Sequence, residues 1–355
     1  MSETPAALGY RMPAEWEPHA ATWLSWPHNR ATWPGQFEPI PGVWAQLVRT
    51  LAPFEPVHIL AGGEAVMAEA RRLVGDVQGV TLHAIATNDA WARDHGPMFL
   101  VGPPDAPPAL VHWGYNAWGG KYAPIDQDQR VPQRIADAIG YLRFEPGIIL
   151  EGGAVDFNGR GTVLTTEQCL LNKNRNPGLS RADVERRLAD YCAARHVIWL
   201  GQGIVGDDTD GHIDEVARFV GPRTVVAAVE QDPTDPNYHA LRDNLSRLRA
   251  STDEAGRPLE VIELPMPRPT FYKTTRLPAS YTNFYIANGV VIVPQFGDTA
   301  DPNADAEVVE ILARLFPERQ VRGLPARELA WGLGTYHCIT QQQARAEIGN
   351  GGQRE

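Results

Sequence analysis

The segment at residues 207–214, DDTDGHID, surrounds one histidine with four aspartates. His212 and Asp214 are two residues apart, directly before the strand-like run EVARFV. In an extended backbone, side chains two residues apart point to the same face, so the sequence predicts a histidine and a carboxylate acting at one place. The density of aspartates also permits a metal site with hard ligands. Its ligands would be His212, Asp214, Asp208 and Asp210. A surface loop with an acidic run is the third interpretation.

Cys338 is the candidate nucleophile. It follows a glycine-containing loop and precedes a polar strand in the segment 332–342, GLGTYHCITQQ, whereas Cys192 lies in an apolar helical pattern. A buried, inert thiol is the alternative, because free cysteine is among the most buried residue types. His337 is adjacent to Cys338, but neighbours in an extended backbone point to opposite faces. We therefore expect His212 to be the working histidine.

Two more segments place a charged residue before a turn. WARDHGP, at residues 91–97, sets Arg93 and Asp94 before a Gly-Pro pair, and LEGGAVDF, at residues 150–157, sets Glu151 before two glycines. Glycines at such positions allow another part of the backbone to approach closely. Each segment is also compatible with ordinary turn chemistry.

A guanidinium group explains why these residue types would assemble. The cation is planar and strongly basic, so two carboxylates on its nitrogens would hold it and aim its central carbon at a thiolate. Asp94 and Asp214 suit that clamp. Glu151 would orient and charge His212, which would protonate departing ammonia and then activate water. The residues predict a metal-free, cofactor-free hydrolase that uses Cys338 to remove ammonia from a small guanidinium compound.

The bulk composition restricts the function classes. The 355 residues carry a net charge of -11, which disfavours a nucleic-acid partner, because such a partner requires a basic surface. Three cysteines are too few for a disulfide framework and fit a reducing cytosol. Residues 1–18 lack the apolar stretch of a signal peptide, and no apolar run approaches the ~18 residues that span a bilayer. We expect a cytoplasmic protein without a membrane partner.

Helices are predicted from apolar spacing. The pattern at residues 303–316 places its apolar side chains on one face, and Asp301 with Pro302 supplies a start signal. A second helix should begin at Ser180, where Asp183 three residues later resembles a capping box.

Two hairpins are predicted at Asn158-Gly159 and Asn288-Gly289, each between β-branched runs. The candidate segments recur about 60 residues apart, which suggests a repeated strand and helix unit. Their positions are Trp91, Glu151, Gly211, Asn283 and His337. About five such α/β units would close a ring in which distant polar residues meet at one centre.

No long linker interrupts this pattern, so we expect one catalytic domain over residues 1–355. About residues 1–9 and 345–355 are predicted to be flexible tails.

Seven ordered segments of the chain together resemble the agmatine deiminases, between Met12 and Gln343. They are WARDHGP, YNAWGGKY, LEGGAVDFNGRGT, CLLNKNRNP, DDTDGHIDEVARFV, ASYTNFYIANGVVIVPQFGD and HCITQQ. The resemblance implies the pentein fold, a five-bladed pseudo-symmetric α/β propeller.

The resemblance also implies roles for five residues. The family's guanidinium-binding aspartates fall on Asp94 and Asp214, its glutamate and histidine on Glu151 and His212, and its nucleophile on Cys338. The implied reaction converts agmatine to N-carbamoylputrescine and ammonia through a covalent thiouronium intermediate, without a cofactor or metal.

The segment before the nucleophile departs from the family, because Leu333 replaces a glycine and Thr335 replaces an asparagine. The substrate is therefore less certain from the sequence than the reaction class. Two alternatives are a deiminase of another guanidino substrate, such as peptidyl arginine, and a non-catalytic protein that binds guanidines or polyamines. The peptidyl-arginine enzymes are exported, and this chain shows no export signal.

The far end of the substrate should also be recognised by acidic and aromatic groups. Asp207, Asp208 and Asp210 lie just before His212, and we expect Asp208 to face the second cation of a small guanidino substrate. The alternative is that these aspartates have a structural role and cap a turn. Trp91 is the other predicted substrate-binding residue. A homodimer is compatible with this interpretation.

Overall fold

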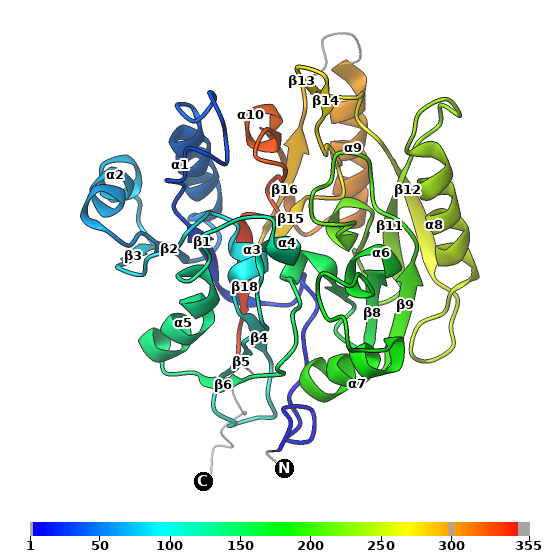
Figure 1. Ribbon diagram of the computed structural model, residues 1–355, viewed down its shortest axis with the longest axis horizontal. Helices are drawn as coiled ribbons and strands as arrows, with labels where there is room; N and C mark the ends of the chain where they lie inside the picture. Colours follow the sequence, from blue (N-terminus) through cyan, green and yellow to red (C-terminus); the bar gives the residue numbers. More distant parts are fainter. Residues whose placement is uncertain (1–2, 298–301, 347–355) are drawn as a thin grey trace.

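One strand pattern recurs through the computed structural model, which describes residues 3–297 and 302–346. Within these residues, five units share it: the first strand is antiparallel to the second, and the second is parallel to a third. A helix connects the second strand to the third in every unit. Figure 1 shows the long helices toward the outside and the short helix α3 near the middle.

The unit that joins the two ends of the described chain has four strands and two long helices. It contains β18 (Thr340–Ala344), β1 (His19–Ser25), α1 (Ile40–Leu51), β2 (Val57–Leu60), α2 (Glu64–Val74) and β3 (Val80–His83).

Each of the other four units has three strands and one long helix, listed here in chain order. The first of them contains β4 (Met98–Leu100), β5 (Ala109–Val111), α5 (Val131–Ile139) and β6 (Leu142–Phe144). The next contains β7 (Asp156–Phe157), β8 (Thr162–Thr166), α7 (Arg181–Cys192) and β9 (His196–Leu200). Then follow β10 (Ala217–Phe219), β11 (Thr224–Val229), α8 (Tyr238–Ala250) and β12 (Glu260–Pro265). The last contains β15 (Tyr285–Ala287), β16 (Val290–Gln295), α9 (Pro302–Leu315) and β17 (Gln320–Pro325).

Short elements connect these units. The α-helical ones are α3 (Ala92–His95), α4 (Ala117–Gly120), α6 (Glu167–Leu170) and α10 (Arg327–Ala330). The 3-10 turns are η1 (Asp128–Arg130), η2 (Gly152–Ala154) and η3 (Ile213–Glu215), and a small hairpin pairs β13 (Phe271–Tyr272) with β14 (Thr275–Arg276).

The predicted helices and hairpins are confirmed. The capping box of α7 is complete, because the Ser180 side chain accepts from the Asp183 backbone and the Asp183 side chain accepts from the Ser180 backbone. Helix α9 follows the predicted apolar pattern, whereas its proposed start signal at Asp301 lies outside the described residues. The Asn-Gly pairs connect β7 with β8 and β15 with β16.

The first strand of each unit follows directly after a candidate segment. β4 follows Asp94, β7 follows Glu151, and β10 follows Asp214. β15 and β18 likewise follow Asn283 and Cys338. Five equivalent positions in the repeat therefore supply the side chains that are candidates for chemistry, although they are far apart in the sequence.

The largest apolar cluster lies under α1, β16 and α9, and it includes Trp26, Trp33 and Trp44. These three rings are completely buried, and the cluster extends to the side chain of Cys338. The loop before β18, which contains Cys338, is thus anchored on the apolar core.

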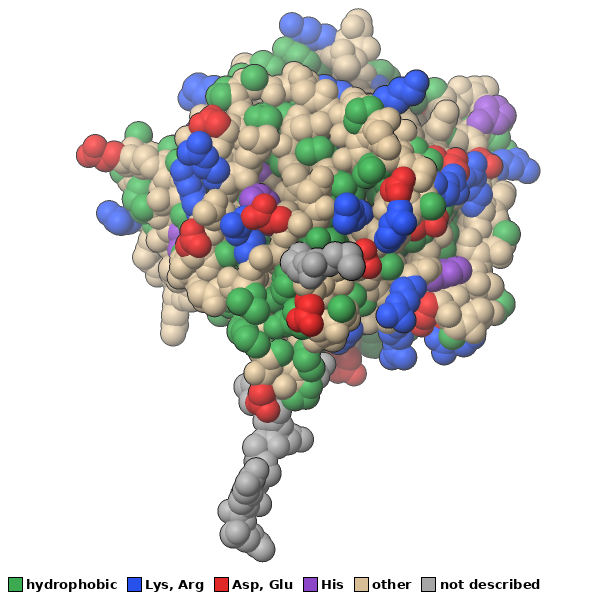
Figure 2. Space-filling view, turned by 60° about the horizontal axis from the view of Figure 1, so that its bottom comes forward, with side chains coloured by type: hydrophobic (Ala, Val, Ile, Leu, Met, Phe, Trp, Pro, Cys, Tyr) green, Lys and Arg blue, Asp and Glu red, His purple; other side chains and the backbone are tan. Residues whose placement is uncertain are grey.

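Acidic and basic side chains are interspersed over the face shown in Figure 2. Exposed ion pairs, such as Arg49–Asp76, also bring opposite charges together on the surface of the described chain. In the described part of the chain, no helix combines the length and apolar character needed to cross a bilayer.

Candidate active site

Gly153 marks the point at which the predicted residues converge. A Cβ atom at this position would lie 2.5 Å from His212 Nδ1, 3.0 Å from Asp94 Oδ1 and 3.1 Å from Asp214 Oδ2. These side chains come from two separate segments, Asp94 from one and His212 with Asp214 from the other, and they face the same small space. The absence of a side chain on residue 153 lets these three groups approach the backbone closely.

Cys338 lies beside the same space. Its Sγ is 3.7 Å from Asp214 Oδ2, and the side chain is 6% exposed. Asn283 donates from Nδ2 to Sγ at 3.1 Å. The orientation of that amide is fixed, because Asn283 Oδ1 accepts from Thr335 Oγ1 at 2.7 Å and from the backbone of His337. The thiol therefore has a donor that would also stabilise a thiolate.

The two predicted clamp carboxylates are held by different partners. Asp94 accepts from Trp118 Nε1 at 2.9 Å and from the Gly153 backbone at 3.0 Å. Asp214 Oδ2 contacts His337 Nδ1 at 2.6 Å, and Asp214 Oδ1 is buried without a partner. Trp118 itself has a φ of 54°, a left-handed conformation that costs free energy in a bulky residue and is typical of functional sites.

Glu151 lies behind His212. Its Oε1 accepts from Arg175 Nε at 2.6 Å, and its Oε2 is 4.0 Å from His212 Nε2. Both ring nitrogens of His212 and Oε2 of Glu151 are buried without a hydrogen-bond partner. Such unpaired buried groups are costly unless a ligand or a reacting group uses them.

Burial and like charge keep the nucleophile and the histidine neutral. Burial, with the nearby charges of Asp214, Glu215 and Asp94, raises the pKa of the Cys338 thiol well above its ordinary value. Burial lowers the pKa of His212 to about 3. Burial and the charges of Asp214 and Glu151 raise the pKa of Asp94 well above its usual range. A cation entering this site would reverse the electrostatic effect on the thiol.

Asp214 is the exception among these buried groups. Burial alone would raise the pKa of its carboxyl, but the hydrogen bond and the charge of His337 hold it below its ordinary value. Asp214 is therefore the carboxylate that is ionised most readily at the centre of the site.

The aspartates of the acidic run before His212 each have partners within the protein. Asp207 accepts from the backbone of Thr209 and Gly211, so it caps the turn, as the structural alternative expected. The carboxylate of Asp208 contacts Tyr122 Oη and lies 3.4 Å from Lys121 Nζ.

The proposed metal ligands are not assembled. Asp210 pairs with Arg175 Nη1 at 2.7 Å and Lys121 Nζ at 3.0 Å, and Asp208 shares the same lysine. These cations occupy the carboxylates that the metal interpretation required. Among the described residues there are two other groups of three side chains, and within each group the possible ligand atoms lie within 4.8 Å of one another. They are Glu151, Cys169 and His212, and Asp214, Glu215 and Cys338.

The backbone reasoning behind two predictions was wrong. Residues 213–215 form a 3-10 turn rather than extended backbone, so His212 and Asp214 meet through that turn and not through a strand face. Residues 336–339 also form a turn. The ring of His337 nevertheless lies behind Asp214, with both of its nitrogens engaged by carboxylates.

Trp91 packs next to the nucleophile. Its ring stacks on Trp33 with centroids 5.6 Å apart. A Cβ atom at Gly334 would lie 2.6 Å from the Trp91 ring and 3.1 Å from Cys338 Sγ. Leu333 has a φ of 73°, which explains why glycine would suit that position.

Several residues of the site were not predicted from the sequence. Trp118, Arg175 and Asn283 lie within quoted segments of the resemblance, so position alone could have indicated them. Arg218 also lies within a quoted segment, whereas Glu15, its ion-pair partner behind Asp214, lies in none of them.

Known proteins resemble this chain over nearly its whole length. A sequence model of the Porphyromonas-type peptidyl-arginine deiminases matches residues 11–344. The chain belongs to this family. An agmatine deiminase of Pseudomonas aeruginosa (strain LESB58) is 40% identical and the match covers 96% of this chain and 97% of that protein. The resemblance predicted from the seven segments is confirmed.

Solved structures extend this similarity to the fold. The agmatine deiminase of Enterococcus faecalis has a TM-score of 0.90 and 34% identity, with coverage of 97% of this chain and 98% of that one. A cysteine-to-serine variant of the C. jejuni agmatine deiminase with substrate bound has a TM-score of 0.86 and 29% identity, covering 95% and 96%. The mixed α/β architecture described above is thus shared with agmatine deiminases.

The raised pKa of Cys338 predicts slow thiol chemistry in the protein without ligand. Alkylation of Cys338 by iodoacetamide should be slow at pH 7 and should still accelerate at pH 9, because the thiolate forms only above the ordinary value of 9.0. Peptide mass spectrometry of the alkylated protein would measure this rate. The Cys338→Ala variant gives the background from Cys169 and Cys192, which are both buried. A rate that reaches its plateau below pH 7 would contradict the electrostatic description.

Proposed function

We propose that this protein is an agmatine deiminase, which hydrolyses agmatine to N-carbamoylputrescine and ammonia. The observation that supports it best is the convergence of Asp94, Asp214, His212 and the Cys338 thiol around Gly153. The names of the relatives at up to 40% identity support the choice of agmatine as the substrate.

The guanidinium group would bind between the two aspartates. Asp214 Oδ1 has no partner, and the oxygens of Asp94 each have a further lone pair beyond their single donors. A planar cation with N–H groups on three nitrogens satisfies these acceptors and neutralises the buried negative charge. Its central carbon is then held next to Cys338 Sγ.

Binding of the cation would also activate the thiol. A positive charge beside Sγ opposes the carboxylates that raise the pKa of Cys338, and Asn283 donates a hydrogen bond to the thiolate that forms. The thiol proton passes to His212, and the thiolate forms a C–S bond to the guanidinium carbon. The resulting tetrahedral intermediate loses ammonia, which takes the proton from His212, and an S-alkylthiouronium remains on Cys338.

The second half of the reaction uses water. Neutral His212 accepts a proton from water as the oxygen attacks the thiouronium carbon. The C–S bond then breaks as the new hydroxyl proton passes to sulfur, which returns the thiol and releases N-carbamoylputrescine, and His212 gives its proton to solvent. Glu151, whose Oε2 is 4.0 Å from His212 Nε2, would stabilise the imidazolium in both halves, and Arg175 keeps that carboxylate oriented.

A small substrate fits this site better than a protein chain. Each of the five proposed catalytic side chains is at most 6% exposed, so the guanidinium carbon must travel into the interior to reach Sγ. Asp208 remains our proposed contact for the second cation of agmatine, which would compete with Lys121 for its carboxylate. Trp91, beside Gly334 and Cys338, would form a wall of the pocket. Deimination of peptidyl arginine is the second candidate, because the matching family carries that name.

The proposal includes the arrangement of the five units. The identical strand order of the five units supports a pentein ring, a five-bladed α/β propeller within a single domain over residues 1–355. The cytoplasmic location and the homodimer stay predictions.

Kinetics on a substrate panel test the proposed function. The panel comprises agmatine, arginine, guanidinobutyrate and a peptidyl arginine, with ammonia and ureido product measured. We expect agmatine to have the highest kcat/KM. Cys338→Ala should lose at least about 10⁴-fold in kcat, whereas Cys192→Ala, a buried thiol remote in sequence, should retain the parent rate. A higher kcat/KM for peptidyl arginine would mean that this compound, and not agmatine, is the substrate. A residual rate above about a tenth of the parent rate in Cys338→Ala would refute the thiol mechanism.

Gly153→Ala tests the assigned binding space. The added Cβ would lie 2.5 Å from His212 Nδ1, so either the catalytic groups shift or the guanidinium is displaced. We expect kcat/KM for agmatine to fall about 10²-fold, the cost typical of a misplacement near 1 Å. Gly178→Ala is the matched control, because its Cβ would meet nothing within 4 Å. Equal activity of the two variants would mean that the substrate does not occupy this space.

A further inference from the structure

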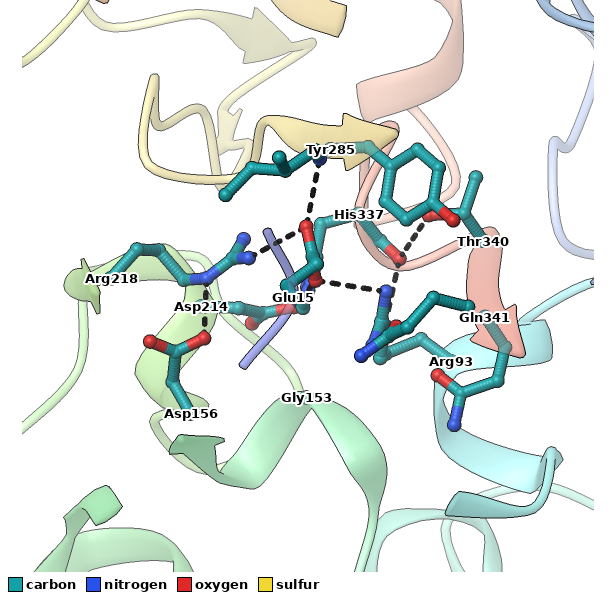
Figure 3. Close-up of polar contacts among 12 residues, drawn as sticks. Glu15, Arg93, Gly153, Asp156, Asp214, Arg218, Tyr285, His337, Thr340 and Gln341 are labelled. Atoms are coloured by element: carbon teal, nitrogen blue, oxygen red, sulfur yellow. Dashed lines mark hydrogen bonds and ion pairs between the residues drawn. The ribbon is translucent and has the colours of Figure 1, made fainter. Parts of the chain in front are cut away.

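Glu15 lies at the centre of a buried group of charges behind the active site, shown in Figure 3. The carboxylate is 5% exposed, and both of its oxygens are surrounded by donors. Oε1 accepts from the Ile286 backbone at 2.8 Å and pairs with Arg218 Nη2 at 2.9 Å. Oε2 lies 2.9 Å from His337 Nε2 and 3.3 Å from Arg93 Nη2. Three hydrogen bonds and the ion pair with Arg218 leave this carboxylate no place for a proton.

His337 connects Glu15 to the active site. Its Nε2 faces Glu15 Oε2, and its Nδ1 faces Asp214 Oδ2 at 2.6 Å. Two ionised carboxylates can only accept, so both ring nitrogens must donate and the ring must be an imidazolium. The ring is 1% exposed, which means that its charge depends on these two anions.

The orientation of Asp214 follows from this contact. Oδ2 is directed toward His337 and lies 3.7 Å from Cys338 Sγ, whereas Oδ1 is buried and has no partner. The imidazolium therefore fixes one oxygen and leaves the other available to a ligand.

We propose that Glu15 is a positioning residue of the reaction: through a cationic His337 it holds Asp214 ionised and oriented to bind the guanidinium group. This inference rests on the proposed function. Glu15 does not touch the space at Gly153; it acts through the 2.9 Å and 2.6 Å contacts of a single ring. The N-terminal segment thereby supports a site whose other residues all lie beyond position 90.

Other charges face these groups and set the direction of the effect. Asp94, Glu215, His212 and Cys338 face Asp214, and the carboxylates among them oppose its ionisation. Arg218 forms ion pairs with Glu15 and, at 2.8 Å, with Asp156, so two other carboxylates share its positive charge.

His337 is thus the cation in direct contact with Asp214. Without the Glu15 carboxylate, His337 Nε2 has no anion to donate to and a neutral ring suffices. Asp214 then loses its cationic partner and would protonate at higher pH.

The test compares Glu15→Gln with Glu15→Asp and the parent on agmatine. Glutamine removes the charge, so the acidic limb of kcat/KM should move upward by about one pH unit, and kcat/KM at pH 7 should fall about 10- to 100-fold. Aspartate keeps the charge, so its acidic limb should stay at the parent position even if its rate falls. Glu17→Gln is the matched control, since Glu17 lies in the same segment and pairs with Arg11 away from the site. A merely structural role would lower the rate in both Glu15 variants without moving either limb.

The protonation state of His337 in the parent protein provides an independent measurement. Long-range ¹H–¹⁵N correlation spectra of histidine-labelled protein, assigned through the backbone of residues 336–338, should show both ring nitrogens protonated at pH 7. A neutral His337 ring at pH 7 would overturn the inference whether or not the variants fold. So would a folded Glu15→Gln protein with the parent pH profile. Failure of the parent to deiminate agmatine would instead refute the proposed function, and the spectra would still report on the His337 bridge.

Discussion

The structure depends on keeping several carboxylates buried around one small space. Asp94, Glu151 and Asp214 are each at most 5% exposed, and their mutual repulsion disfavours ionisation of all three. The chain offsets this repulsion from behind: Arg175 neutralises Glu151, and His337 neutralises Asp214. Asp94 has only neutral donors, so it is the group whose charge depends most on the arrival of a cation. Unsatisfied negative potential at this point is what makes a guanidinium the fitting ligand.

The repeated fold makes this concentration of charge feasible. Each unit supplies one short segment immediately before its first strand, so groups from five places in the sequence meet without a long loop. Backbone details adjust the distances. Gly153 lets the catalytic side chains approach its backbone closely, and the left-handed Trp118 brings its indole N–H to Asp94. The apolar cluster around Trp33 and Trp91 supports the other side of Cys338.

Much of this site was predictable from residue types next to turns. A charged residue before a Gly-Pro pair or two glycines indicated Asp94 and Glu151, and the two-residue spacing from His212 indicated Asp214. Guanidinium chemistry explained why they belong with a thiol. The local backbone was not predictable, because tertiary contacts rather than strand propensity determine the turn at residues 213–215. Partners from other units were also missed: Tyr122 and Lys121 reach Asp208 across 86 and 87 positions. Glu15 carried no motif, since its role depends entirely on three cations gathered by the fold.

The central claim is that Cys338 attacks the guanidinium carbon held between Asp94 and Asp214. Intact-protein and peptide mass spectrometry after rapid acid quench of the protein with agmatine tests it most directly. The account predicts a transient adduct on Cys338 whose mass equals agmatine less ammonia, and its accumulation in His212→Ala if that histidine activates the water. Turnover of agmatine by the parent with no adduct on Cys338 at any quench time, together with a persistent rate in Cys338→Ala, would contradict the account.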